Sequence, residues 1–486
     1  MTYIGSLDQG TTSTRFIIFN EFGEIIASHQ LEHNQILPKS GWVEHDAEEI
    51  WQNTQKVISE TIDKAKIASS DLKAIGITNQ RETVVAWDRI SGKPLANAIV
   101  WQDTRTADYL NSLPESAKAA ITKKTGTPIA PYFSASKMAW LLKLLKNSIS
   151  DANNLAFGTI DSWLLFKLTG EFKTDVTNAS RTQLMNLETL DWDQELLEIF
   201  GIRREWLPEI RSSSEIYGKT KDGVPIAGIL GDQQAAMVGQ TCFEKGDSKT
   251  TYGTGNFALI STGEELIRSS HGLLTTVLYK LGNQPVQYAL EGSVAVTGSA
   301  VQWLRDQLGI INSASEIEAL AATVPDTGGV YFVPAFSGLF APYWRSDARG
   351  VIVGLTRANT KAHIARAALE AICYQTKEVL EAMEADGKIK LNEMRVDGGI
   401  TNNKLCMQLQ SDIMGIDVVK PVITETTALG AAFAAGLATG VWKDTNEIKA
   451  IWKLEKTWHP ESSAEWRNAG YQKWRKAITR TFDWVD

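Results

Sequence analysis

The stretch from Asp8 to Arg15 has the residue types of a phosphate-binding turn. It lies between two short apolar runs, which predicts a strand, a tight polar turn and a second strand. Gly10 lets the backbone bend where a side chain would clash. The hydroxyls of Thr11, Thr12 and Ser13, with the N–H groups of the turn, could donate hydrogen bonds to phosphate oxygens. A threonine-rich turn without any ligand is the alternative.

Two charged side chains of the same stretch extend this chemistry. Arg15 offers a fixed positive charge for a terminal phosphate. Asp8 could hold a Mg²⁺ ion through water, because this ion usually keeps several of its waters. The chain therefore opens with a predicted hairpin suited to the phosphates of a nucleotide.

A second stretch of the same kind, Lys249 to Thr262, begins about halfway along the chain. It again runs from a β-branched segment through a Gly/Thr turn, which includes Thr254, into an apolar segment. Two such hairpins, one in each half, suggest two related domains that face each other across a cleft.

Polar residues follow two predicted strands at the points where these strands end. Asp232 comes directly after an apolar run and before a helix predicted from Gln233, where α/β proteins place their ligands. It could act as a general base toward a substrate hydroxyl, or it could cap its helix. Arg81 and Glu82 follow the strand at residues 74–78 and would suit a small polyhydroxy substrate; a surface salt-bridge turn is the alternative.

Other residues could complete a site. Trp101 and Tyr132 could form pocket walls, although each could also be a core residue. The glycine pair after Asp397 could let a nucleoside approach the backbone closely, and a plain glycine-rich loop is the alternative.

The composition limits the class of protein. With 486 residues, 43% of them hydrophobic, the chain is too long for one core and is ordinary for a globular protein. The net charge of −8 argues against a nucleic-acid surface. Three cysteines without paired spacing predict neither a metal site nor a disulfide. We expect a cytoplasmic protein without membrane insertion, because no secretion signal or spanning segment is visible.

Strand and helix patterns alternate in both halves, which predicts an α/β fold. A strand at residues 83–87 is expected to form a hairpin with that at 74–78. Apolar periodicity predicts helices at residues 47–65, 136–145, 159–167, 298–308, 362–384 and 464–484, and a packed helix is expected within 428–441. The last aromatic-rich helix is expected to dock on its own domain, with a subunit contact as the alternative.

Familiar phosphoryl-transfer signatures are missing from the sequence. Gly218-Lys219-Thr220 looks like the end of a P-loop, but position 213 is Ser213 and the pattern fails. No protein-kinase HRD or DFG triplet is present, and no GxGxxG follows a strand. Any phosphoryl transfer by this chain must use another architecture.

The ordered motifs resemble those of the glycerol kinases of the FGGY carbohydrate-kinase family, within the actin/hexokinase-like (ribonuclease H-like) ATPase fold. The resemblance covers residues 4 to about 440 in order. The motifs that carry it are Asp8–Arg15, Ser40–Asp46, Gly76–Glu82, Ile99–Thr104, Pro131–Ser134, Thr177–Thr182, Gly231–Ala235, Thr251–Gly255, Tyr288–Gly292, Gln302–Asp306, Val333–Phe336, Ala341–Trp344 and Arg395–Gly399.

This resemblance implies ATP- and Mg²⁺-dependent phosphorylation of glycerol to sn-glycerol 3-phosphate. It implies an N-terminal domain at residues 1–244, a C-terminal domain at 245–486 and an interdomain cleft. The implied base is Asp232, and Asp8 would lie near Mg²⁺. The implied glycerol contacts are Arg81, Glu82, Trp101, Tyr132, Asp232, Gln233 and Phe257. The implied ATP contacts are Thr11, Thr12, Ser13, Arg15, Thr254, Gly298, Gln302, Gly399 and Asn403.

The resemblance also implies a homodimer or homotetramer, whereas regulation is expected to differ. Some bacterial members carry a loop that binds fructose 1,6-bisphosphate. The corresponding segment of this chain, residues 219–225, is short, so regulation by this sugar phosphate is not expected. Residues 460–464 do not match the docking site for a sugar-transport regulator. Three alternatives stay open: another FGGY sugar kinase, a non-catalytic nucleotide sensor, and an actin-like or chaperone-like ATPase.

Overall fold

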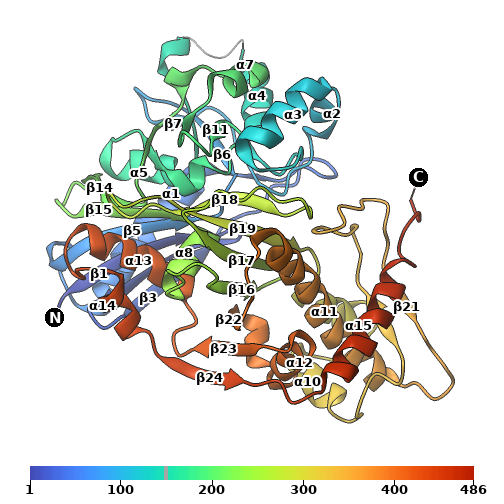
Figure 1. Ribbon diagram of the computed structural model, residues 1–486. Helices are drawn as coiled ribbons and strands as arrows, with labels where there is room; N and C mark the ends of the chain where they lie inside the picture. Colours follow the sequence, from blue (N-terminus) through green and yellow to red (C-terminus); the bar gives the residue numbers. More distant parts are fainter. Residues whose placement is uncertain (147–150, 486) are drawn as a thin grey trace.

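The computed structural model describes residues 1–146 and 151–485 and contains two large mixed sheets (Figure 1). The first sheet belongs to the N-terminal half. Its strands, in spatial order, are β14 (Ser214–Lys219), β15 (Pro225–Gly231), β5 (Leu72–Asn79), β1 (Tyr3–Gln9), β2 (Ser13–Asn20) and β3 (Ile25–Glu32).

The second sheet repeats the pairing pattern of the first. In each, a central strand pairs antiparallel with the next strand of a hairpin on one side and parallel with a later strand on the other. Both predicted polar hairpins are therefore confirmed, one in each half of the chain. The strands of the second sheet, in order, are β18 (Leu274–Tyr279), β19 (Gln287–Val294), β17 (Asn256–Gly263), β16 (Ser248–Tyr252), β22 (Glu393–Gly398), β23 (Asp417–Pro421) and β24 (Leu454–Trp458).

Smaller sheets complete the strand inventory. One of five strands joins β4 (Glu44–His45), β8 (Ala98–Ile99), β6 (Val84–Asp88), β7 (Lys93–Pro94) and β9 (Leu155–Thr159). The paired short strands are β10 (Lys173–Asp175) with β13 (Glu209–Arg211), β11 (Met185–Asn186) with β12 (Asp191–Trp192), and β20 (Tyr331–Val333) with β21 (Val351–Val353).

The predicted hairpin between residues 74–78 and 83–87 is wrong. Strand β6 leaves the first sheet and pairs with β9 and β8 instead. The chain changes direction just before β6, where Glu82 has a φ of 59°. A positive φ is uncommon outside glycine, and here it directs the chain away from β5.

Most predicted helices are confirmed within a few residues, and the helix expected from Gln233 begins at Asp232. The helices are α1 (Ala47–Ala65), α2 (Ala107–Asn111), α3 (Glu115–Thr125), α4 (Ser134–Leu145), α5 (Ile160–Thr169), α6 (Val176–Ala179), α7 (Gln194–Phe200), α8 (Asp232–Gly239), α9 (Gly298–Asp306), α10 (Glu316–Ala321), α11 (Lys361–Gly387), α12 (Lys404–Met414), α13 (Thr426–Ala438), α14 (Thr445–Ile451) and α15 (Ala464–Ile478).

Helices α8 and α13 connect the two halves. Helix α13 comes from the C-terminal half but packs on β1, β5 and β15 of the first sheet, below that sheet in Figure 1. Helix α8 contacts strands of both sheets. The two helices cross at glycines: a Cβ on Gly430 would lie 1.8 Å from the carbonyl oxygen of Ala235, and one on Gly239 would lie 1.9 Å from that of Thr426. Only glycine permits this approach.

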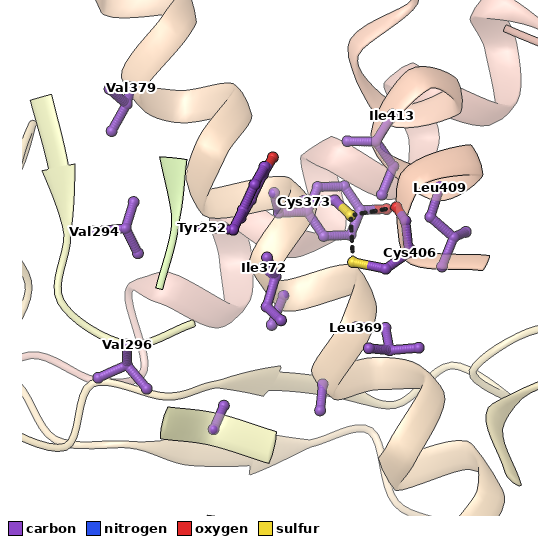
Figure 2. Close-up of a cluster of buried hydrophobic side chains, with 14 of the residues drawn as sticks. Tyr252, Val294, Val296, Leu369, Ile372, Cys373, Val379, Cys406, Leu409 and Ile413 are labelled. Atoms are coloured by element: carbon purple, nitrogen blue, oxygen red, sulfur yellow. Dashed lines mark hydrogen bonds between the residues drawn. The ribbon is translucent and has the colours of Figure 1, made fainter. Parts of the chain in front are cut away.

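The core of the C-terminal half lies between the second sheet and helices α11 and α12 (Figure 2). Tyr252 of β16 packs there, and its hydroxyl donates a hydrogen bond to Gln410 at 2.8 Å. Cys373 and Cys406 are free thiols whose sulfur atoms lie 4.0 Å apart in this apolar cluster. Buried free cysteines of this kind behave as small apolar side chains.

The C-terminal helix docks on its own half, as predicted. Trp474 and Ile478 of α15 are buried in the core of the C-terminal half, and α15 contacts α12 and β20. The predicted internal helix at 428–441 is also confirmed as α13, whose residues 428–436 are buried. Across the described parts of the chain, no helix combines the length and the apolar character needed to cross a membrane.

A buried carboxyl gives the C-terminal half a pH-dependent stability. Burial raises the pKa of Glu378 from 4.5 to about 7, although the Tyr343 hydroxyl donates a hydrogen bond to it. Since the folded-state pKa exceeds the unfolded value, the stability that Glu378 contributes is fully present below pH 4.5 and is lost as pH rises to about 7. The variant Glu378→Gln avoids this loss, because a glutamine side chain carries no proton that is released in this pH range.

We compare the melting temperature of Glu378→Gln with that of the wild type at two pH values. The difference, variant minus wild type, should be about 2 °C larger at pH 8 than at pH 5. Thermal unfolding followed by circular dichroism measures it. Glu205→Gln, at an exposed glutamate, is the matched control and should show no such pH dependence. An equal difference at both pH values would contradict the assignment.

Candidate functional site

The candidate site lies where two parallel strands of the first sheet end. Strands β5 and β15 are neighbours, and Asn79 pairs with Gly231 at their ends. The residues that follow, Arg81 and Glu82 on one side and Asp232 on the other, therefore meet at one sheet edge, where α/β folds bind ligands. The family resemblance placed these three side chains in one site, and the structure brings them together.

Arg81 is the centre of this cluster. Its side chain is only 2% exposed, so the alternative of a surface salt-bridge turn is wrong. Its Nη1 and Nη2 atoms each donate to one carboxylate oxygen of Glu291 at 2.7 Å, which is the strong two-pronged pairing of a guanidinium with a carboxylate. Its Nε lies 3.1 Å from Oδ1 of Asp232. The guanidinium thus connects Asp232 with a strand of the second sheet.

Glu82 is held by a second buried cation. Nε of Arg181 donates to its carboxylate at 2.6 Å, and Ser134 donates to its backbone carbonyl at 2.9 Å. Arg181 also lies 3.5 Å from Glu291. Four buried charges, two of each sign, therefore alternate beside Asp232.

The two arginines set the charge state of Glu291. Burial by itself would raise the pKa of this carboxyl, but Arg181 and Arg81 outweigh burial and lower the pKa to about 2. Glu291 is therefore a carboxylate at neutral pH. For Glu82, burial outweighs the two arginines and the pKa is raised.

Asp232 is the accessible acid of the cluster. It is the first residue of α8, and its side chain is 33% exposed whereas those of its neighbours Arg81 and Glu82 are almost fully buried. Gly231 occupies the N-cap position. The carboxylate accepts from the backbone N–H of Gln233 at 2.7 Å and keeps an open side, as a base toward an incoming hydroxyl requires.

The predicted aromatic walls lie next to this cluster. The rings of Trp101 and Tyr132 pack edge to face with centroids 5.4 Å apart. Arg181 lies under Tyr132, 5.9 Å from its ring centroid. The indole N–H of Trp101 donates to the hydroxyl of Thr11 at 2.9 Å, so the predicted substrate wall and the first hairpin are in contact. Phe257 is partly exposed on β17 opposite Thr251.

The first hairpin has the predicted turn. The N–H of Gly10 donates to the carbonyl of Ser13 at 2.9 Å, and Thr12 at the tip is exposed. The Ser13 hydroxyl accepts a hydrogen bond from Gln30 at 3.0 Å. Hydroxyls and N–H groups are thus gathered at one exposed tip.

Asp8 and Arg15 pair with each other in this structure. Arg15 lies 2.8 Å from Asp8 and 2.6 Å from Glu425. Burial raises the pKa of Asp8, and the nearby charges of Glu425 and Asp232 raise it further, although Arg15 opposes them. A cation bound to phosphates would relieve this concentration of carboxylates, and Mg²⁺ prefers such oxygen ligands with phosphate and water. The described residues contain no group of three or more His, Cys, Asp or Glu side chains that could hold a metal ion, so Asp8 could hold Mg²⁺ only together with phosphate and water oxygens.

The second hairpin packs against the start of α9. The N–H groups of Thr297 and Ser299 both donate to the carbonyl of Thr254 at 3.0 Å. A Cβ on Gly298 would lie 2.5 Å from the carbonyl oxygen of Gly253, so this position requires glycine. Thr254 itself is exposed, as is Gln302 further along α9.

The other two predicted nucleoside residues, Gly399 and Asn403, follow β22. Gly399 is exposed, and a Cβ added there would meet nothing within 4 Å, which leaves room for a ligand close to the backbone. Asn403 caps α12 through its side-chain oxygen, which accepts from the N–H of Cys406 at 2.8 Å. Its amide nitrogen is the group left to contact a ligand.

A hollow outside this site is formed by the N-terminal half. It has a volume of about 520 Å³ and is lined by residues that include Trp51, Arg89, Lys167 and Lys219, and by none of the predicted site residues.

Sequence reasoning missed three buried charged residues. Glu291 and Arg181 lay inside motifs that carried the family resemblance, but no role was given to them. Lys249 is the second residue of β16 and is fully buried. The available signal was a charge within an otherwise apolar or β-branched strand, as in Ala289-Leu290-Glu291, because a buried charge needs a partner.

Family models match both halves of the chain. The N-terminal domain of the FGGY family of carbohydrate kinases matches residues 3–239, and the C-terminal domain of that family matches residues 249–439. The chain belongs to the FGGY family of carbohydrate kinases. Its fold class is thereby confirmed as the two-domain fold of this kinase family.

Relatives within the family are similar over their full length. A glycerol kinase of Mycolicibacterium gilvum (strain PYR-GCK) is 58% identical, with 100% of this chain and 99% of the relative covered. A glycerol kinase of Mycobacterium tuberculosis (strain H37Rv) is 57% identical, covering 100% and 97%.

Solved structures agree with this assignment. The crystal structure of Plasmodium falciparum glycerol kinase with ADP has a TM-score of 0.93 and 42% identity, covering 99% of this chain and 98% of that one. A gluconate kinase from Lactobacillus acidophilus has a TM-score of 0.88 but only 25% identity, covering 99% and 97%.

Removing Glu291 from the buried charge cluster of this FGGY kinase should lower the stability of the fold. Glu291→Ala leaves Arg81 and Arg181 without their shared carboxylate, and an uncompensated buried charge costs about 3–5 kcal/mol of unfolding free energy. Urea unfolding followed by tryptophan fluorescence measures the loss.

The matched control is Glu188→Ala. Glu188 also pairs with an arginine, Arg268 at 3.0 Å, but its side chain is 66% exposed. We expect a change within about 0.5 kcal/mol for it. Equal effects of the two variants would show that the buried pairing contributes no more than a surface pair.

Proposed function

We propose that this FGGY kinase transfers the γ-phosphate of ATP to a terminal hydroxyl of glycerol, giving sn-glycerol 3-phosphate and ADP. The observation that carries the proposal is Asp232, an accessible carboxylate fixed by buried Arg81 at the start of α8. The identity of 57–58% to glycerol kinases over the whole chain supports the choice of glycerol.

The geometry of the cluster suits a small polyol. Carboxylate and guanidinium groups lie at one end, and the edge-to-face pair of Trp101 and Tyr132 offers an apolar wall for the carbon chain. A site that hydrogen-bonds each hydroxyl rejects analogues that lack one, because buried polar groups would be left unpaired. Another FGGY sugar kinase is the second candidate, but the related gluconate kinase is only 25% identical.

In this proposal Asp232 is the general base. Its open carboxylate side would accept the proton of the reacting hydroxyl, while Arg81 holds its other side in place. Phosphoryl transfer depends on in-line positioning and charge neutralisation more than on covalent help. The fixed orientation of Asp232 provides the positioning.

The two hairpins would hold the phosphates from opposite sides. Thr11, Thr12, Ser13 and Thr254 would donate hydrogen bonds, and Arg15 would exchange its carboxylate partners for phosphate oxygens. Asp8 would hold Mg²⁺ through water, and the bound ion supplies neutralising charge to the phosphates. Gly298, Gln302, Gly399 and Asn403 would surround the nucleoside.

Water must be excluded during transfer, because ATP would otherwise be hydrolysed. We therefore propose that the two halves close around the substrates, with a boundary near residues 244 and 245. A nucleotide sensor or a protein-activated ATPase would not need the polyol-binding cluster around Arg81.

Assembly, location and regulation remain predictions. We expect a cytoplasmic homodimer or homotetramer. The turn between β14 and β15 is closed by a hydrogen bond from the N–H of Thr220 to the carbonyl of Val224 at 2.8 Å. Such a compact turn supports the expectation that fructose 1,6-bisphosphate has no loop to bind there.

The function is tested by ADP release with Mg-ATP and glycerol. We expect glycerol-dependent turnover in the wild type and a loss of about 10²–10⁴-fold in kcat for Asp232→Asn, which removes the base and keeps the size. Asp63→Asn, at an exposed position on α1, is the matched control and should keep full activity.

Two results would contradict parts of this account. Equal activity of Asp232→Asn and wild type would reduce Asp232 to a structural role at the start of its helix. Absence of glycerol-dependent turnover in the wild type would remove the proposed substrate and would direct the assay to pentuloses and gluconate.

A further inference from the structure

Lys249 is a buried cation that touches the substrate cluster from the second half of the chain. It lies on β16 with no exposed surface. Its Nζ atom donates to the side-chain oxygen Oε1 of Gln233 and, at 2.8 Å, to the hydroxyl of Thr251. Gln233 is the neighbour of Asp232 on α8, so this contact joins the second sheet to the start of α8.

The charge of Lys249 determines which atom of the Gln233 side-chain amide it can hydrogen-bond. Burial lowers the pKa of Lys249 to about 8, against the opposing effect of Asp397, Asp232 and Glu291. The side chain is therefore an ammonium at pH 7. An ammonium has three donors and no acceptor, so it can pair with the oxygen of Gln233 and not with the amide nitrogen.

The other end of Gln233 is open. Within residues 1–146 and 151–485, no protein group accepts a hydrogen bond from its Nε2, and this atom is not among the fully buried polar atoms that lack partners. Nε2 therefore has accessible surface, on the residue that directly follows Asp232 at the start of α8. The first two residues of α8 thus offer an acceptor from Asp232 and a donor from Gln233 that is unpaired within the described residues.

We infer that Lys249 is a positioning residue that fixes the amide of Gln233 with its donor end toward the substrate, and thereby sets the preference for a polyol with a hydroxyl at that point. The inference rests on the proposed function, since it concerns how glycerol is bound. Lys249 itself touches no substrate in this scheme. Its effect is exerted through Gln233.

A double-mutant cycle tests this inference through glycerol binding and KM. We expect Lys249→Met to raise KM about 3–10-fold with little change in kcat, the size of one hydrogen bond. In a Gln233→Leu background, the same change should have no further effect on KM, because non-additivity identifies residues that act through one another. Thr251→Val, which removes the other acceptor of the same ammonium, should raise KM less than about 2-fold.

Substrate analogues separate this role from a merely structural one. 1,2-Propanediol and 1,3-propanediol each lack one of the three hydroxyls of glycerol. The preference is the ratio of kcat/KM for glycerol to kcat/KM for a diol. If Lys249 acts through the donor of Gln233, this ratio should fall in Lys249→Met for one of the two diols, by the same factor as the KM for glycerol rises. A general loss of structure would instead lower kcat/KM equally for all three compounds.

A further variant leaves Lys249 in place, in case Lys249→Met does not fold. Gln233→Glu keeps an oxygen for the ammonium but lacks the N–H donor, so it should weaken glycerol binding as much as Gln233→Leu, measured by calorimetry. Retained affinity in Gln233→Glu, or additive effects in the cycle, would overturn the inference while wild-type glycerol turnover persists. A wild type that neither binds nor phosphorylates glycerol would overturn both this inference and the proposed function.

Discussion

The buried pairing of Arg81 with Glu291 is the interaction on which the site depends. It joins the end of β5 in the first sheet to β19 in the second, through two hydrogen bonds of 2.7 Å. A guanidinium buried to this degree needs a full carboxylate partner. Because the same guanidinium also contacts Asp232 at 3.1 Å, the position of the proposed base depends on both halves of the chain.

The two large sheets of the molecule share one arrangement of strands around a hairpin. Each sheet supplies one polar hairpin at the end of its central strand, and α8 and α13 lie between the sheets with glycine contacts at their crossing. The polar residues after β5 and β15 contact both sheets, since Arg81 pairs with Glu291 on β19 and Gln233 accepts from Lys249 on β16. In this FGGY kinase, the two polar hairpins come from a pairing pattern that both sheets share.

Local signals in the sequence predicted much of this structure. The two polar hairpins and most helices follow from the periodicity of apolar residues and from the glycine-rich turns. The polar residues at the ends of two strands marked Arg81, Glu82 and Asp232 separately, and only the family resemblance placed them in one site. The direction of β6 could not be predicted, because it depends on the positive φ of Glu82. The partners Glu291 and Arg181 are distant in sequence, so only the folded chain shows that they surround Arg81.

The most direct test of the central claim is the identity of the product formed from Mg-ATP and glycerol. Phosphorus NMR and a stereospecific assay can identify the phosphate ester that appears together with ADP. The account predicts one product, sn-glycerol 3-phosphate, formed in equal amount to ADP. Inorganic phosphate without an ester, or esterification of a sugar in preference to glycerol, would contradict it.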